Sequence, residues 1–64
     1  MKMTLKALRA NKNLTLEEAS KKLGVSETTL RNWEAGKTYP RVNELYKIEQ
    51  AYDVKYDNIN FFIK

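Results

Sequence analysis

The chain has 64 residues, 42% of them hydrophobic, and a net charge of +4, which is typical of one small domain. It contains no Cys and no His, so a disulfide framework, a Cys/His zinc site and thiol or imidazole catalysis are excluded. No apolar run approaches the ~18 residues of a membrane span, and the N-terminal MKMTLK lacks the apolar core of a secretory signal. We therefore expect a cytoplasmic protein without metal or cofactor.

The positive charge is concentrated in the first two thirds of the chain. Residues 1–41 hold nine Lys or Arg against four acidic residues, whereas residues 42–64 hold three against four. Such an excess favours a polyanionic partner, although a solvated surface that happens to be basic gives the same count. Which of these two interpretations applies depends on where the helices place the basic side chains.

Capping residues predict a first helix directly after the N-terminus. Thr4 has the side chain of a helix N-cap, and the apolar stripe of the following helix begins with Leu5 and Leu8. Asn13 suits the left-handed conformation that often terminates a helix. The first helix is therefore expected to end near residues 11–13.

The next signals predict two helices joined by a tight turn. Thr15 with Glu18 three residues later forms a capping box, and Gly24 is a helix stop, which predicts a second helix over about 16–23. Ser26 is a good N-cap for a third helix. Because so few residues separate the two helices, the third must leave at a large angle, as in a helix-turn-helix unit.

The third helix has one apolar side and one polar side. At about 100° per residue, Leu30 and Trp33 share a side with Val25, which precedes the helix, so we expect Trp33 in the core rather than stacked on a base. The opposite side holds polar side chains, namely Glu27, Thr28, Arg31 and Asn32. Such a ridge can read base edges in the DNA major groove. The alternative is an ordinary solvated face with an i,i+4 ion pair.

From Leu5 to about Phe62, the sequence resembles the helix-turn-helix domain of phage repressor, Cro and XRE-like regulators. The matching stretches are LKALR, LTLEEASKKLGVSETTLRNWEAGKTYP and ELYKIEQAYDV. The run LGVSxxTLxxWExGKxxP is too specific for chance agreement. The resemblance implies an all-α, five-helix, lambda-repressor-like domain over residues 1–64, with its helix-turn-helix unit over about 16–34, that binds operator DNA, usually as a homodimer.

The resemblance also implies roles for individual residues. The base-reading positions fall on Glu27, Thr28 and Asn32, with Arg31 beside them as a base or phosphate contact. The phosphate-contacting positions fall on Thr15, Leu16, Ser26, Lys37, Thr38, Tyr39 and Arg41. The ion pair between the first and third helices falls on Arg9 and Glu34, whose places on the two helices independently suit such a pair.

Three positions depart from the family pattern near helix starts. Leu16 replaces a usual Gln, so that only its backbone N–H and the helix dipole remain to attract a phosphate. Arg41 and Lys55 stand where capping Ser or Thr are common. The fourth and fifth helices are therefore expected to fray at their starts.

Glu49 falls inside the arc of the fourth helix that is expected to face inward. That arc consists of Val42, Leu45, Tyr46 and Tyr52. An inward carboxylate is costly unless it is paired or wet. Either the small Ala19 leaves room for the Glu49 stem or Tyr52, or the fourth helix is rotated and Glu49 reaches solvent; we favour the rotation.

The C-terminal segment 54–64 is expected to form a fifth helix and a dimerisation end. Tyr56, Ile59 and Phe62 or Ile63 fall on one stripe, with Phe61 left over. One side of so short a helix cannot bury all of these side chains. Pairing with a second copy would cover the excess, through Ile59, Phe61, Phe62 and Ile63. A monomer whose tail only closes its own core is the alternative.

These features predict a small sequence-specific transcription regulator of the Cro or short-repressor type, from a phage, prophage or bacterial cell, that binds a two-fold operator. The alternative is a protein-interaction module on the same scaffold, such as an antitoxin or anti-repressor. An enzyme is not expected, because no pair of carboxylates and no nucleophile with a base is credibly placed. The expected partners are double-stranded DNA and a second copy of the chain, with no membrane and no small-molecule substrate.

Overall fold

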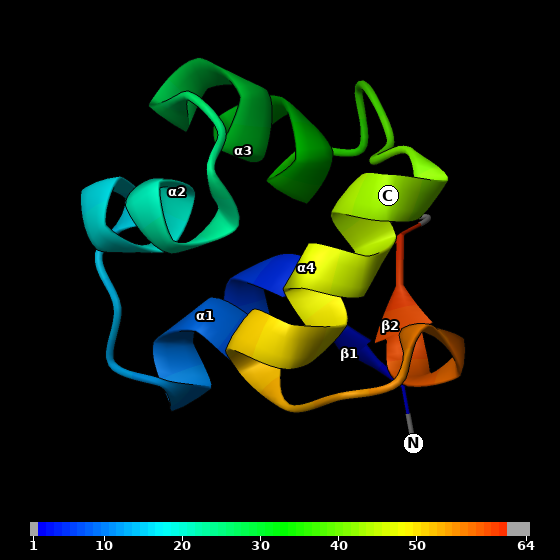
Figure 1. The fold of residues 1–64 in the computed structure, drawn as a ribbon. Helices are drawn as coiled ribbons and strands as arrows, with labels where there is room; N and C mark the ends of the chain where they lie inside the picture. The colour runs from blue at the N-terminus through cyan, green and yellow to red at the C-terminus, as the bar shows by residue number, and fades with distance from the viewer. Residues whose placement is uncertain (1, 62–64) are drawn as a thin grey trace.

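The computed structural model describes residues 2–61, which form four α-helices, one turn of 3-10 helix and a two-stranded sheet. Helices α1 (Leu5–Asn11), α2 (Leu16–Leu23), α3 (Glu27–Glu34) and α4 (Val42–Tyr52) are followed by the 3-10 turn η1 (Tyr56–Asn58), as Figure 1 shows. Strand β1 (Met3–Thr4) pairs in parallel with β2 (Ile59–Asn60). Within residues 2–61, no helix is long and apolar enough to cross a membrane.

The starts of α1 and α2 follow from the predicted capping residues. Thr4 Oγ1 accepts the Ala7 N–H at 3.1 Å. The Thr15–Glu18 capping box is complete, with hydrogen bonds of 2.9 and 3.1 Å. Asn13 adopts the predicted left-handed conformation, with φ 57°. Each cap satisfies an N–H that has no partner inside its helix, so the predicted bounds of these two helices are confirmed.

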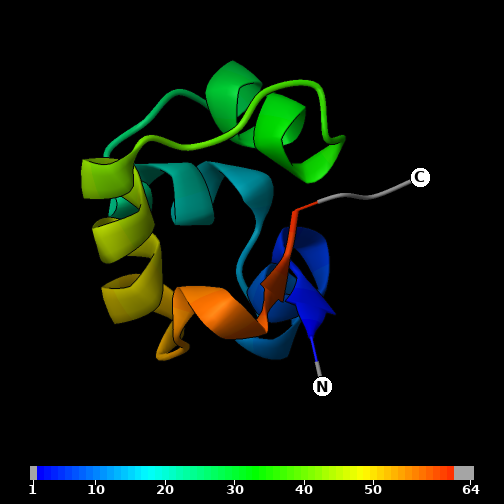
Figure 2. The same ribbon diagram turned by 90° about the vertical axis from the view of Figure 1, so that its right-hand side faces the viewer.

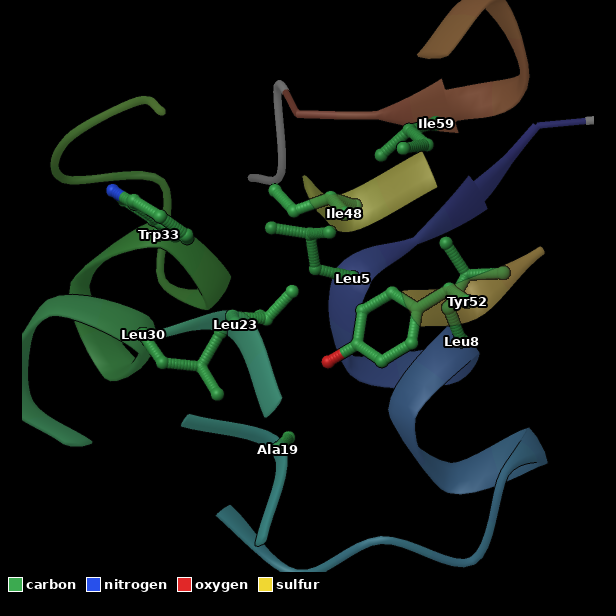
Figure 3. Packing of buried hydrophobic residues seen from close by; sticks show 9 residues of the cluster. All are labelled: Leu5, Leu8, Ala19, Leu23, Leu30, Trp33, Ile48, Tyr52 and Ile59. Atoms are coloured by element: carbon green, nitrogen blue, oxygen red, sulfur yellow. The ribbon is translucent and has the colours of Figure 1, made fainter. Parts of the chain in front are cut away.

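The core lies between the four helices and is closed by β2. Figure 3 shows its buried hydrophobic side chains, which are Leu5, Leu8, Ala19, Leu23, Leu30, Trp33, Ile48, Tyr52 and Ile59. Trp33 is only 3% exposed, which confirms the prediction that it belongs to the core. Tyr52 is 2% exposed, and its ring points toward α2 in Figure 3, where Ala19 offers only a methyl group. Tyr52 therefore packs on the side of the core where α2 carries a small residue.

Helix α4 is rotated relative to the expected inward arc. The expectation that Val42 and Tyr46 point inward is wrong, because they are 83% and 64% exposed, respectively. Tyr52 is buried as expected, and Ile48, which the expected arc did not include, is buried with it. These two residues are four positions apart and lie on one side of the helix, and that side sets the rotation.

Two glutamates of α4 supply the capping that Arg41 and Lys55 do not. Glu44 Oε1 accepts the Arg41 N–H at 2.8 Å at the start of α4. Glu49 Oε2 accepts the Tyr56 N–H at 2.8 Å at the start of η1. Glu49 is half-buried and lines a surface groove, so it reaches solvent, as the rotated alternative predicts. Each start thus has a side-chain acceptor, contrary to the expectation that it frays.

The expected fifth helix is not formed by the described part of segment 54–64. The chain makes η1 and then extends as β2, in which Ile59 lies beside Met3 and Asn60 beside Thr4. Asn and β-branched Ile are poorer helix formers than Ala or Leu, and the strand gains hydrogen bonds to β1 that a helix would not make. The domain is therefore all-α in class, and residues 2–61 form four α-helices instead of the expected five.

The residues expected at the dimerisation end have different places. Ile59 is 3% exposed and belongs to the core of its own chain, so it is not available as a surface residue. Phe61 is partly buried and packs against the same core. Phe62 and Ile63 lie outside the described residues.

Candidate nucleic-acid interface

A tight turn sets the angle between α2 and α3. Gly24 has φ +72°, a left-handed conformation that Gly adopts without strain. It reverses the chain so that the Val25 N–H donates to Ser20 O at 3.0 Å. Ser26 then begins α3, and its Oγ accepts the Thr29 N–H at 3.1 Å. The helix-turn-helix arrangement predicted from these residues is confirmed.

Helix α3 lies at one edge of the molecule. Figures 1 and 2 show it at the top in both views, with the other helices below it. Its inner side is anchored by Leu30 and Trp33, which are buried. Its outer side is polar, with Glu27, Thr28 and Arg31 exposed and Asn32 partly exposed. The four side chains predicted to read bases therefore lie on a helix whose outer side is open.

The predicted ion pair between Arg9 and Glu34 is formed and joins α1 to α3. Arg9 Nε lies 2.8 Å from Glu34 Oε2, and Arg9 Nη2 lies 3.2 Å from Oε1, so the contact is bidentate. Arg9 Nη1 donates to Leu14 O at 3.1 Å, so the same side chain also binds the loop between α1 and α2. The hydrogen bonds that Arg9 donates to Glu34 raise the pKa of Arg9 above its ordinary value. This guanidinium therefore joins α1, the following loop and α3, and it helps the buried Leu30 and Trp33 to hold α3 in place.

The start of α2 places two of the phosphate-contacting candidates together. Thr15 Oγ1 accepts the Glu18 N–H at 3.1 Å, and Glu18 Oε1 accepts the Thr15 N–H at 2.9 Å. These hydrogen bonds lower the pKa of the Glu18 carboxyl. The Thr15 hydroxyl accepts in this arrangement and can still donate its own proton. Leu16 follows as the first residue of α2, where backbone N–H groups attract anions.

The loop after α3 begins with a turn that holds it against the end of that helix. Gly36 is left-handed, with φ +75°, and the Lys37 N–H donates to Asn32 O at 3.0 Å. This bond ties Lys37 to the last turn of α3, next to the base-reading candidates. The other phosphate-contacting candidates of this loop, Thr38, Tyr39 and Arg41, are exposed at the surface. The hydroxyl of Ser26, another phosphate-contacting candidate, donates a hydrogen bond within the chain, to Thr29 Oγ1 at 2.9 Å.

A recess between α1 and α3 adds a residue that the sequence analysis did not include. The recess has a volume of about 310 Å³ and is lined by Lys6, Arg9, Leu16, Arg31, Glu34 and Ala35. Lys6 is exposed and stands three residues before Arg9 on the same helix. That i,i+3 spacing from the predicted ion-pair residue was the available signal. The sequence does not show how α1 packs on α3, however, so it does not distinguish Lys6 from the other surface lysines.

The chain is similar to curated helix-turn-helix proteins over most of its length. A family profile for helix-turn-helix domains matches residues 5–59. An uncharacterized HTH-type transcriptional regulator of Methanocaldococcus jannaschii is 44% identical over 59 residues, which cover 92% of this chain and 89% of the relative. An uncharacterized HTH-type transcriptional regulator of Archaeoglobus fulgidus is 36% identical over 62 residues, covering 97% and 87%. No solved structure shows significant similarity.

A longer protein matches as well. The HTH-type transcriptional activator BcrR of Enterococcus faecalis is 40% identical over 55 residues, which cover 86% of this chain but only 27% of that relative. The chain belongs to the XRE-type helix-turn-helix family, whose matched relatives are named as transcriptional regulators.

Proposed function

We propose that the chain is a sequence-specific DNA-binding regulator of transcription, of the Cro or short-repressor type, which inserts α3 into the major groove. The observation behind this proposal is the polar outer side of α3, held in place by the buried Leu30 and Trp33 and by the Arg9–Glu34 pair. An α-helix fits the major groove, where each base pair presents a distinct pattern of donors and acceptors.

The side chains of α3 suit distinct parts of the bases. Asn32 can make a bidentate contact with adenine, and Arg31 can do so with guanine or bind a phosphate. The Glu27 carboxylate accepts from the cytosine amino group, and the Thr28 methyl packs against a thymine methyl. Around this helix, the hydroxyl of Thr15 and the ammonium group of Lys37 would meet backbone phosphates and set the register.

Selection of bound duplexes from a random DNA pool tests this proposal. We expect a short sequence to be enriched. We also expect the logarithm of the binding constant to fall linearly with the logarithm of the salt concentration, because phosphate contacts release counterions. Affinity for the enriched site should exceed affinity for random DNA by at least about 10³-fold. A chain that binds DNA of every sequence equally, or binds none, would contradict the proposal.

We also propose that two copies bind the DNA together, on two half-sites about one helical turn apart, ~34 Å or ~10 base pairs from centre to centre. The support is an apolar groove of about 410 Å³ along α4, lined by Val42, Leu45, Tyr46, Glu49 and Tyr56. Val42, Tyr46 and Tyr56 are 83%, 64% and 57% exposed. Residues 42–64 have three basic and four acidic side chains, so this part of a second copy is not repelled as the strongly basic part would be.

Sedimentation of matched variants tests the second copy. Tyr46→Glu should shift the chain toward monomer at micromolar concentration and weaken binding to the full site more than binding to one half-site. Asn43→Glu adds the same charge to an exposed position of α4 that does not line the groove, so it should leave the assembly unchanged. A monomeric unmodified chain, with a selected site that has no inverted repeat, would rule out the pairing.

A further inference from the structure

We propose that the recess between α1 and α3 receives a phosphate of the DNA backbone and that Lys6 is the cation that binds it. This assignment rests on the proposed DNA binding and adds a contact from α1. The other DNA-contacting candidates lie on α2 and α3, at the N-caps of these two helices, and in the loop that follows α3. Because the chain is proposed to bind DNA, the ligand of this recess is a phosphodiester group of the duplex.

The charges around the recess favour an anion. Lys6 and Arg31 are both exposed at its rim, on α1 and α3 respectively. Glu34 also lines the recess, and an unpaired carboxylate there would repel a phosphate. Both Glu34 oxygens are instead bonded to Arg9, at 2.8 and 3.2 Å, and the Glu34 side chain is only 8% exposed. The ion pair thus offsets the acidic charge and leaves the rim positive.

The position of the recess fits the DNA backbone better than the bases. Leu16, the first residue of α2, forms part of its lining, so the recess adjoins the start of α2 that already offers the Thr15 hydroxyl and backbone N–H groups. Arg31 connects it to the outer side of α3. Backbone phosphates line both edges of the major groove. With α3 in that groove, the recess beside it therefore faces a phosphate strand.

The test compares Lys6→Gln with Lys22→Gln in the unmodified background. Lys22 is also exposed and carries the same charge, but it lines a separate groove with Tyr46, Lys47, Gln50 and Ala51. Binding of each protein to random duplex DNA is measured over a series of salt concentrations. We expect Lys6→Gln to lower the magnitude of the salt slope by about one and to weaken binding roughly tenfold at 0.1 M salt, whereas Lys22→Gln leaves both unchanged. Lys6→Arg should retain the slope.

The outcomes separate this assignment from the proposed function. If the unmodified chain binds DNA and Lys6→Gln has the same salt slope as the unmodified chain, the recess assignment is wrong and the proposed function stands. Equal losses for Lys6→Gln and Lys22→Gln would also overturn it, because they would show a general effect of net charge. If the unmodified chain binds no DNA, both proposals fall. Circular dichroism of each variant confirms that it is folded.

Discussion

At the scale of single residues, Arg9 has the most consequences for the site. Its guanidinium bonds to both oxygens of Glu34 and to Leu14 O, so one side chain joins α1, the following loop and α3. Five N–H groups in a rigid fork make Arg suited to such a contact, whereas Lys would supply a point charge. The pair is largely withdrawn from solvent, with side-chain exposures of 18% and 8%. Loss of either partner would therefore leave the other charge poorly solvated.

A double-mutant cycle on Arg9→Met and Glu34→Gln measures this coupling. Each single variant should lower the free energy of unfolding clearly, by about 3 kcal/mol, because the remaining partner keeps an unmet hydrogen-bonding demand. The double variant should lose less than the sum of the two, with a coupling energy of about 1 kcal/mol or more. Urea unfolding gives all four values. A coupling energy near zero would mean that the two residues stabilise the protein independently.

Tyr52 is a second residue whose environment has a measurable effect. Its hydroxyl is buried and has no hydrogen-bond partner within residues 2–61. Burial, and then the negative charge of Glu34, raise the pKa of Tyr52 to about 12. In the unfolded chain, a tyrosine ionises near pH 10. As the pH rises from about 10 to 12, the unfolded state therefore loses a proton that the folded state keeps, and the folded protein should lose stability.

The variant Tyr52→Phe isolates this contribution. At pH 7, we expect it to be as stable as the unmodified chain or slightly more stable, because a buried hydroxyl without a partner costs about 1 to 3 kcal/mol. Between pH 7 and pH 11, it should lose less stability than the unmodified chain does. All other side chains are the same in both proteins, so their effect cancels in the comparison. Identical pH dependence of urea unfolding in the two proteins would contradict this description of Tyr52.

At the scale of elements, local signals were sufficient where a helix begins and ends at a capping residue. Thr4, Thr15, Gly24 and Ser26 predict the bounds of α1, α2 and α3 because each acts within a few residues of its own position. Helix α4 has apolar residues on more than one side, so its periodicity did not identify the buried stripe. Only packing against α2 and the other helices selects that stripe.

The turn between α2 and α3 allows a direct test at this scale. Among the residues that the structure describes, a Cβ built on Gly24 would meet only Lys47 Nζ, at 3.5 Å, which is ordinary contact with the end of a flexible side chain. The cost of Gly24→Ala therefore comes from φ +72°, and it should be about 1 to 2 kcal/mol in the free energy of unfolding. Gly24→Asn should lose less, because Asn tolerates the left-handed conformation. Thermal unfolding of the three proteins distinguishes these values; equal stability of Gly24→Ala and the unmodified chain would contradict the strain.

At the scale of the whole molecule, the parts that sequence alone did not predict depend on contacts between distant segments. The pairing of β1 with β2 brings residues 3–4 beside residues 59–60, and no local pattern near Ile59 indicates that partner. The recess that includes Lys6 also exists only because α1 packs on α3. By contrast, Glu27, Thr28, Arg31 and Asn32 share the outer side of one helix, so periodicity was enough to group them.

The first 41 residues of the chain and the remainder differ in net charge. The basic residues are concentrated in positions 1–41, which include α1, α2, α3 and the loop that follows. The near-neutral remainder contains α4, with its exposed apolar side chains, and η1. In the proposed function, the first part binds DNA and the second part binds another copy of the chain. We propose above all that the outer side of α3 reads bases while neighbouring cations bind phosphates.

The most direct measurement of that claim is the affinity of Asn32→Ala and Lys37→Ala for the selected DNA site and for random DNA. Asn32→Ala should lose about 1 to 3 kcal/mol of binding free energy on the selected site and almost nothing on random DNA, because a base contact provides specificity. Lys37→Ala should weaken binding to both DNAs alike and lower the salt slope by about one, because a phosphate contact does not depend on sequence. Equal losses on both DNAs for Asn32→Ala would contradict the assignment of α3 as the base-reading helix.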